Sequence, residues 1–399
     1  MSRLLIIIFI LLSFYSANAA ESVVDWVNNN VSRNPLIQAS FLEIEEIETK
    51  SQIAKTWQSP NIHFSYGSLY GISVSQPLPV LGKQNFLSQI YEEELAIARL
   101  KHQLLYRQLV QQITVLAFEL KIIDSQYAFE VHRQKKLELA EAFLRSRPIA
   151  SPQVNAQAQI VKQQIKKVES ELLELQSQRD QLKEKLAFYQ ANTAVPEIGW
   201  LKAEKDIFAG QNLTEDLNHN DDLLILEKNL MKLGEEKKLM AAENWSDPVL
   251  SGSYDQPFST LNEKTYFLGL GINLPVWGGN RALVDSIDKK IMRERIEIDY
   301  QKRILENELK RAVMVYQIAR QRAQLYHPLK LTQTTETFDR LERDFKKELI
   351  DLLTFIELDK QIADTASLTF QAQRALVDSI SKIARLTGRN DLPELLVNQ

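Results

Sequence analysis

Two short sequence patterns occur in the same order in both halves of the chain, and they constrain its fold more than any other feature. Trp57-Gln58-Ser59-Pro60 matches Trp245-Ser246-Asp247-Pro248, and Leu78-Pro79-Val80-Leu81-Gly82 matches Leu274-Pro275-Val276-Trp277-Gly278. Because two patterns rarely match in order by chance, they indicate an internal repeat. The sequence therefore predicts two copies of one unit, which consists of a helix, a β-hairpin and a long helical hairpin.

The repeat gives the chain an expected domain organisation. The first copy is expected at residues 20–191, with a β-hairpin at 60–77 and a helical hairpin at 84–190. The second copy is expected at 211–399, with a β-hairpin at 248–275 and a helical hairpin at 281–387. A linker at 192–210 is expected to join the two copies. The linker contains Pro196, Gly199 and Gly210 and has no clear hydrophobic period, which is typical of a connecting segment.

Strand signals lie between the two patterns of each copy. Ile72-Ser73-Val74-Ser75 alternates apolar and polar residues, which is the period of a strand with two different faces. We expect strands at 61–66, 70–76, 249–254 and 266–273, where aromatic residues cluster. Since a single hairpin is marginal in water, two hairpins this far apart need partner strands. A barrel assembled from several chains would supply them.

The rest of each copy predicts long helices. Residues 84–145 contain no proline and carry apolar residues at helical spacing, so this helix is expected to be on the order of 90 Å long. Pro148 and Pro152 break it, because proline lacks the helical N–H group. A second helix at 153–189 is expected to return antiparallel to the first.

The second copy repeats this arrangement with one difference. We expect an outgoing helix at 281–346 and a returning helix at 352–387, joined by a turn near 348–351. Pro328 lies inside the outgoing segment and predicts a kink or a local break there. Gly388 is expected to cap the returning helix at its C-terminus.

The N-terminus has the pattern of a secretory signal peptide. Arg3 is the positive residue, Leu4–Leu12 is the apolar run and Ala17-Asn18-Ala19 is the small-residue cleavage site, so residues 1–19 are expected to be removed. A secreted chain of this size without cysteine suits the bacterial periplasm or outer membrane. No later apolar run is long enough for a transmembrane helix, so a membrane-crossing part would have to be β-strands closed into a barrel.

No motif for covalent chemistry or for a cofactor stands out. The five histidines are far apart in sequence and cysteine is absent, so no metal-site spacing exists. Gly269-Leu270-Gly271 lacks the third glycine of a dinucleotide motif and is better interpreted as a strand with small residues facing a crowded wall. A net charge of −4 without a basic run argues against nucleic acid. We therefore expect neither an enzyme nor a cofactor.

The segments that join strand to helix carry a family resemblance. Residues Ser73–Lys83 and Gly269–Gly279 resemble the strand-to-helix junction of the TolC-like outer membrane efflux family, and Gln76–Lys83 looks closest to its heavy-metal efflux branch. The junction residues are Gln76, Pro77, Gly82, Pro275, Gly278 and Gly279. The resemblance covers nearly the whole mature chain.

This resemblance implies a fold that is mainly α with a membrane β-barrel. It implies a homotrimer in the outer membrane of a Gram-negative bacterium, with four strands from each chain in one twelve-stranded barrel and a periplasmic α-helical tunnel. It implies passive conduction in tripartite efflux or type I secretion, with a periplasmic adaptor protein and an inner-membrane pump of the resistance-nodulation-division or ABC type. The barrel would contact outer membrane lipid.

The resemblance also implies functional residues at the periplasmic end. The family's aperture motif, roughly G-x-x-S/T-x-x-D-x-x-D, puts Glu348 at the glycine, Asp351 at the hydroxyl position, and Thr354 and Glu357 at the two acids. Glu348 and Thr354 depart from the motif, and Asp351 would restore the charge one helical turn away. Asp351, Thr354, Phe355 and Glu357 are expected to close the aperture around a threefold axis. The ordinary alternative for Glu357 is a solvated surface carboxylate.

The two helical turns are expected to contact the adaptor, because turn residues are exposed where a duct ends. The residues concerned are Arg147, Pro148, Ser151, Pro152, Lys346, Lys347 and Glu348. The basic side chains among them offer charge for complementarity with a partner.

Two other classes of protein fit parts of the sequence. A periplasmic adaptor also has a helical hairpin flanked by β-structure, but it has one hairpin and many strands. A structural coiled-coil protein of the envelope would explain the helices. It would not explain two patterns that recur around alternating aromatic strands.

Overall fold

The computed structural model describes residues 22–66, 69–79, 82–146, 152–189, 195–257, 264–272, 281–327 and 329–397. The expected signal peptide, 1–19, lies outside these residues. None of the helices formed within the described ranges is long and apolar enough to cross a membrane. The chain folds as two compact units: unit 1 comprises Met1–Pro35, Tyr106–Leu217 and Glu306–Gln399, and unit 2 comprises Leu36–Leu105 and Asn218–Leu305.

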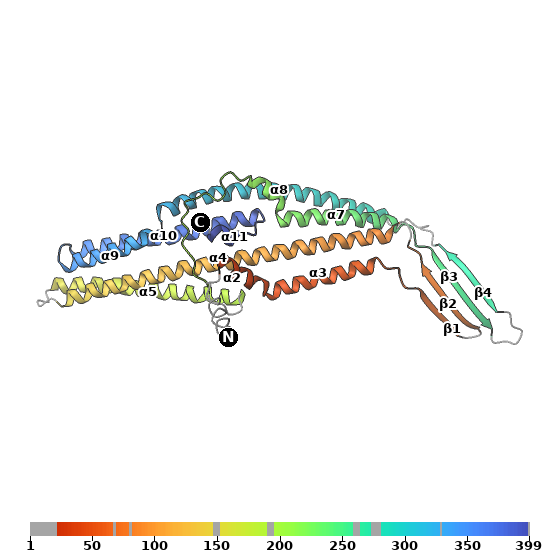
Figure 1. The fold of residues 1–399 in the computed structure, drawn as a ribbon, viewed down its shortest axis with the longest axis horizontal. Helices are drawn as coiled ribbons and strands as arrows, with labels where there is room; N and C mark the ends of the chain where they lie inside the picture. The colour runs from red at the N-terminus through yellow and green to blue at the C-terminus, as the bar shows by residue number, and fades with distance from the viewer. Residues whose placement is uncertain are drawn as a thin grey trace, which may run out of the picture. The chain divides into compact units, whose positions relative to one another are not determined.

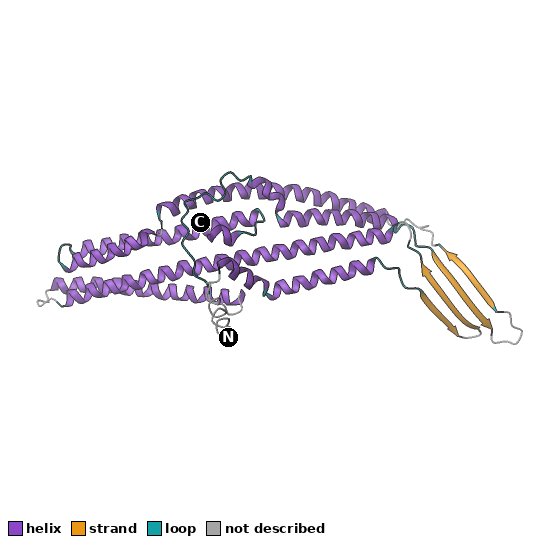
Figure 2. Cartoon of the chain, in the orientation of Figure 1, coloured by secondary structure: helices purple, strands orange, loops and turns teal. Residues whose placement is uncertain are grey.

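Helices dominate both units (Figures 1 and 2). The elements in chain order are α2 (Val23–Ser32), α3 (Pro35–Ala54), β1 (Asn61–Tyr66), β2 (Leu69–Pro77), α4 (Lys83–Arg145), α5 (Pro152–Tyr189), α6 (Leu213–Asp216), a 3-10 turn (Leu217–His219), α7 (Asp221–Ala242), β3 (Val249–Pro257), β4 (Thr265–Gly271), α8 (Arg281–Leu325), α9 (Leu329–Lys346), α10 (Leu352–Leu386) and α11 (Leu392–Val397). The order helix, hairpin, long helix and returning helix occurs twice along this list.

All four strands lie in unit 2 and form one antiparallel sheet in the order β1-β2-β3-β4 (Figure 2). The two hairpins predicted from the sequence are confirmed, and the contact between β2 and β3 joins them edge to edge. In the register across the sheet, Phe64 faces Ile72, Ile72 faces Tyr254, and Tyr254 faces Tyr266. The register therefore places apolar residues beside one another across all four strands.

Ion pairs connect the helices of unit 2 across the two halves of the sequence. Lys228 and Lys232 of α7 contact Glu93 and Glu94 of α4, at 3.0 Å and 2.6 Å. Partly exposed pairs such as these each contribute only ~0.2–1 kcal/mol. Their main effect is therefore to specify that α7 lies beside α4, and their contribution to the stability of the fold is small.

The core of unit 1 lies between two helical hairpins, α4–α5 and α9–α10. Its buried residues are Leu137, Ala140, Leu144, Ala158, Val161, Ile165, Val168, Leu341, Phe345, Leu352 and Phe355. The Phe345 and Phe355 rings lie 4.8 Å apart, so α9 and α10 pack directly against each other. Apolar residues at a helical period thus bury one stripe of each helix, as amphipathic helices do.

Two sequence predictions about helix ends are confirmed. α8 ends at Leu325 and α9 begins at Leu329, so the outgoing helix is broken around position 328, although Pro328 itself lies outside the described residues. Gly388 has a φ of 64°, and the N–H of Arg389 donates to the carbonyl of Ala384 at 2.9 Å. This is the left-handed cap that glycine permits at a helix C-terminus.

The expected linker is packed against unit 1 rather than loosely connecting two parts. The Gln373 side chain of α10 accepts a hydrogen bond from the N–H of Leu201 and donates one to its carbonyl, at 3.2 and 3.0 Å. Arg320 and Gln324 of α8 donate to the Ala203 carbonyl. Residues 195–210 form a segment without helix or strand, here called the strap, whose backbone is held by side chains of α8 and α10.

We predict that Gln373→Ala loosens the strap. Both polar groups of Leu201 would lose their partners in a buried setting, which costs about 1–3 kcal/mol for each unsatisfied group. The measurement is limited proteolysis within 195–210 together with thermal unfolding followed by far-ultraviolet circular dichroism. Gln371→Ala is the matched control, because Gln371 is exposed on the same helix. Equal cleavage rates in the two variants would contradict the assigned role.

Candidate functional site

The β-sheet has one apolar and one polar face. The apolar face carries Ile62, Phe64, Tyr66, Tyr70, Ile72, Val74, Leu250, Tyr254, Tyr266, Leu268 and Leu270. The opposite face carries mainly polar and small residues, which include Asn61, His63, Ser65, Ser73, Ser75, Ser251, Ser253, Asp255 and Thr265, and it also carries Leu69, Val249 and Phe267. On the apolar face Tyr66 is 81% exposed and Leu268 is 80% exposed. An apolar patch of this size marks an interaction surface.

The polar face is crowded at its glycines. A Cβ atom at Gly269 would lie 2.5 Å from the Phe267 ring, and one at Gly71 would lie 2.1 Å from the Ser65 hydroxyl. Small residues are therefore required here by neighbouring side chains of the same face. The structure confirms the interpretation of Gly269 and Gly271 as strand residues.

Side chains fix the point where the strands meet the helices. The Gln76 side chain donates to the Gln58 carbonyl at 2.8 Å, and Lys83 donates to the Asp247 carboxylate at 2.9 Å. Pro77 ends β2, and Gly82 precedes α4 with a φ of 71° that favours glycine. Hydrogen bonds thus connect the first predicted junction, which includes Gln76 and Lys83, to the W-x-x-P segments of both copies, which contain Gln58 and Asp247. Pro275, Gly278 and Gly279 lie outside the described residues.

The turn between α9 and α10 has the backbone of a glycine turn without a glycine. Glu348 has a φ of 58°, and the N–H of Leu349 donates to the Asp344 carbonyl at 2.9 Å. This bond between residues five apart, with a left-handed residue before it, is the Schellman arrangement. Lys346 pairs with Glu342 at 2.6 Å, and Lys347 is exposed. At the other helical turn, Pro152 is the exposed first residue of α5, whereas Arg147, Pro148 and Ser151 lie outside the described residues.

Asp351 caps the N-terminus of α10. Its carboxylate accepts a hydrogen bond from the N–H of Thr354 at 2.7 Å. Hydrogen bonds from the Thr354 hydroxyl and N–H hold the pKa of Asp351 below its usual value. The cap therefore stabilises the helix above the pKa of the unfolded chain, and this contribution is lost as the pH falls through the lowered pKa.

The expectation that Phe355 shares an exposed face with Asp351 and Thr354 is wrong. Phe355 is 0% exposed and belongs to the core of unit 1, because it follows Leu352 on the buried stripe of α10. Thr354 and Glu357 are exposed, and Glu357 accepts a hydrogen bond from Gln361 at 3.2 Å.

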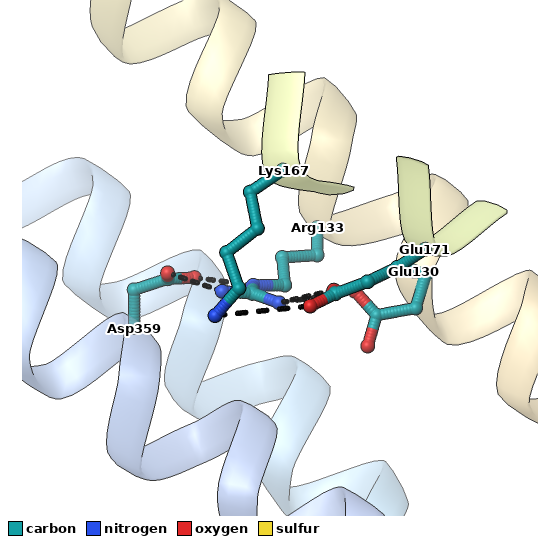
Figure 3. Close-up of polar contacts among 5 residues, drawn as sticks. All are labelled: Glu130, Arg133, Lys167, Glu171 and Asp359. Atoms are coloured by element: carbon teal, nitrogen blue, oxygen red, sulfur yellow. Dashed lines mark hydrogen bonds and ion pairs between the residues drawn. The ribbon is translucent and has the colours of Figure 1, made fainter. Parts of the chain in front are cut away.

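A buried charge cluster ties α10 to α4 and α5 (Figure 3). Arg133 donates two hydrogen bonds to the Asp359 carboxylate, at 2.9 and 2.8 Å, and further ones to Glu130 and Glu171. Burial disfavours the charged guanidinium, but the hydrogen bonds and charge of Asp359 outweigh it, so the pKa of Arg133 is raised. This parallel two-bond geometry fixes both distance and orientation between α4 and α10.

Sequence reasoning missed this cluster and the Gln373 clamp, although α10 carries a signal for both. Its apolar stripe is interrupted at helical spacing by polar residues, at Asp359 and again at Gln373, and each is only 1% exposed. A polar residue at a core position needs a partner, so both positions could have been marked as sites of buried pairing.

Comparison with solved structures gives the fold directly. CusC matches 93% of this chain and 93% of its own length with a TM-score of 0.76 and 13% identity, in work that describes transmembrane channel formation. The MtrE outer membrane channel of Neisseria gonorrhoeae matches 93% of the chain with a TM-score of 0.73 and 14% identity, over 89% of its own length. The outer membrane protein VceC of Vibrio cholerae matches 92% of this chain with a TM-score of 0.72 and 13% identity, over 96% of its own length.

The chain has the TolC-like fold. No protein-family model and no curated protein matches the sequence. At identities of 11–14% the backbone arrangement is shared while most side chains differ.

We predict that Arg133→Met destabilises this TolC-like chain by about 3–5 kcal/mol, because it leaves the Asp359 carboxylate buried and unpaired. The double variant Arg133→Met with Asp359→Leu should recover part of the loss, since it removes both charges of the pair, although Glu130 still lacks its arginine partner. Thermal unfolding of the three proteins measures this. If the double variant is no more stable than Arg133→Met alone, the unpaired Asp359 carboxylate is not the cause of the lost stability.

We predict that Glu348→Gly stabilises the turn by about 0.5–1 kcal/mol, since glycine adopts positive φ without steric cost. Lys347→Gly is the control. Lys347 is not among the described residues with positive φ, so there the extra backbone freedom of glycine should lower the melting temperature. If both variants shift the melting temperature in the same direction, the left-handed backbone at position 348 is not the cause.

Proposed function

We propose that this protein is an outer membrane exit duct that passively conducts substrates from the periplasm to the exterior of a Gram-negative bacterium, without catalysing a reaction. The observation that carries the proposal is the sheet with one exposed apolar face and one polar face. Strands that cross an outer membrane alternate apolar residues toward lipid with polar residues toward the interior. The likeness to CusC, MtrE and VceC supports the same role.

The duct is proposed to be a homotrimer with a twelve-stranded barrel. β1 and β4 each have a hydrogen-bonded neighbour on one side only among the described strands. In lipid every backbone N–H and carbonyl needs a partner, so β4 of one chain would pair with β1 of the next until the sheet closes. The four strands of each of three chains give twelve.

The helices are proposed to form a periplasmic tunnel that meets a periplasmic adaptor and an inner-membrane pump of the resistance-nodulation-division or ABC type, in efflux or type I secretion. The turn between α9 and α10 offers an exposed basic residue, Lys347, and a rigid backbone around Glu348. An exposed turn held in one conformation loses little entropy on binding a partner. Arg147, Pro148, Ser151 and Pro152 are proposed to make the matching contact at the other turn.

The periplasmic aperture is proposed to involve Asp351, Thr354 and Glu357, all of which are exposed. Carboxylates from three chains that converge at one opening would repel each other and attract cations. Phe355 is not part of this set, because it is buried in its own chain.

We predict that Asp351→Ser combined with Glu357→Gln changes the single-channel conductance in planar bilayers and weakens block by divalent cations. Serine keeps the helix cap while removing the charge, so the helix itself should persist. Asp364→Asn is the control, because Asp364 is an exposed acid farther along the same helix. If conductance and cation block both match those of the parent protein, the aperture lies elsewhere.

We predict that Leu268→Arg prevents insertion while Ser253→Arg does not. A cation at mid-depth on the lipid face costs about 2–4 kcal/mol, whereas Ser253 lies on the opposite, polar face of the sheet. The measurement is recovery of a heat-modifiable oligomer in the outer membrane fraction. Recovery of Leu268→Arg at the level of Ser253→Arg would contradict the membrane role of the apolar face.

A further inference from the structure

A pocket of about 550 Å³ lies in unit 2 where the helices end and the strands begin. It is formed by the C-terminal ends of α3 and α7 and the start of α4, elements that Figure 1 shows at the base of the sheet. Its volume falls within the ~300–1,000 Å³ of ordinary ligand pockets. None of the functions described above uses this pocket.

The lining combines both signs of charge with aromatic and apolar surface. Lys50 and Glu243 contribute opposite charges, Trp57 and Tyr91 contribute rings, and Ile53 and Leu239 contribute apolar contact. Lys83 and Asp247 also line the pocket, but they pair with each other at the strand–helix junction. Lys50 pairs with Glu46, which does not line the pocket, so within the described part of the chain Lys50 and Glu243 are the lining charges without an ion pair to another lining residue.

The position of the pocket along the chain relates it to the apolar face of the sheet. Trp57 and Gln58 lie a few residues before β1, and Pro79 lies two residues after the end of β2. Trp57 is 63% exposed, and Trp245, four residues before β3, is 54% exposed. Tryptophan is enriched where a membrane meets water, because its ring is apolar and its N–H is polar. The two tryptophans and the pocket thus lie at the level where a membrane around the strands would end.

We propose that this pocket binds the zwitterionic phosphoethanolamine headgroup of an outer membrane phospholipid. Lys50 would contact the phosphate and Glu243 the ammonium group, while Trp57 and Ile53 contact the start of the acyl chains. The proposal rests on the membrane placement proposed above. A second copy of the chain is the competing occupant, and it would leave no lipid in the pocket.

The charges decide between lipid classes. An anionic headgroup would be attracted by Lys50 and repelled by Glu243, whereas a zwitterionic headgroup satisfies both. The Lys50 ammonium already pairs with Glu46 at 2.5 Å on the same helix. A lysine has three donors, so this pair does not prevent a further bond to phosphate.

The test is native mass spectrometry of the full-length protein purified from nanodiscs that contain equal amounts of phosphatidylethanolamine and phosphatidylglycerol. The parent protein should retain phosphatidylethanolamine in excess. Lys50→Gln should weaken retention of both lipids about tenfold, and Glu243→Gln should weaken phosphatidylethanolamine alone. Lys55→Gln is the matched control, because Lys55 does not line the pocket and, like Lys50, has an exposed side chain (58% and 51%) paired with a glutamate.

Three results would overturn the proposal: equal lipid retention in Lys50→Gln and Lys55→Gln, an oligomer that retains neither lipid class, or binding of soluble phosphoethanolamine as tight as that of the lipid. Soluble phosphoethanolamine distinguishes a headgroup site from a site for the free compound. If it displaces the lipid only at large excess, the acyl chains contribute, and if it binds alone as tightly, the site is not a lipid site. Because the same spectra report the oligomer mass, absence of a trimer would contradict the proposed function, whereas a lipid-free trimer would contradict this inference alone.

Discussion

One face of the β1–β4 sheet carries apolar side chains that the chain itself leaves exposed, and within the part of the chain that the structure describes the two outer strands have a hydrogen-bonded neighbour on one side only. In water, exposed apolar surface costs roughly 25 cal/mol per Å² relative to burial, so a face with residues such as Phe64, Leu268 and Leu270 needs a cover. Lipid can cover the face and further copies can pair the edges. The duplicated order of elements follows from the same requirement, because each long helical hairpin brings one β-hairpin to the shared sheet.

The helices meet a different requirement, which is alignment. Long amphipathic helices can slide along each other with little loss of apolar contact, since each stripe repeats with nearly the same period. A buried pair such as Arg133 and Asp359 removes that freedom, because its two hydrogen bonds form at one position only. Such a pair adds little net stability compared with apolar residues, yet breaking it is costly. We therefore infer that the Arg133–Asp359 pair lies in this core because it fixes the alignment of α4 with α10.

The sequence predicted features that depend on local chemistry. The alternation around Ile72 and Val74 predicted the strands, Pro328 predicted the break between α8 and α9, and Gly388 predicted the cap of α10. Features that depend on distant partners were not predicted. The segment with Pro196, Gly199 and Gly210 was interpreted as a linker, because nothing in it shows that Gln373, on α10, holds its backbone.

The same dependence on distant partners explains why the candidate site was predicted only in part. The expected aperture set included both Phe355 and Asp351, but α10 buries the stripe that includes Leu352 and Phe355. The packing of α10 against α4, α5 and α9 determines which of its faces is buried, and the sequence does not show those contacts. Glu348, in the turn between α9 and α10, has a left-handed backbone, a conformation that glycine adopts far more readily than other residues. A residue type that does not signal a left-handed turn can therefore still occupy one.

Under the proposed function, the apolar face of the sheet lies in lipid and the opposite face lines a water-filled interior. The chain contains no cysteine, so single cysteines can be placed along β4 without a background signal. The measurement is labelling of these variants in intact outer membranes with a lipophilic and a water-soluble thiol reagent. Cysteines at 266, 268 and 270 should react with the lipophilic reagent, and those at 265, 267 and 271 with the water-soluble one. Uniform labelling by the water-soluble reagent along the strand would contradict the account.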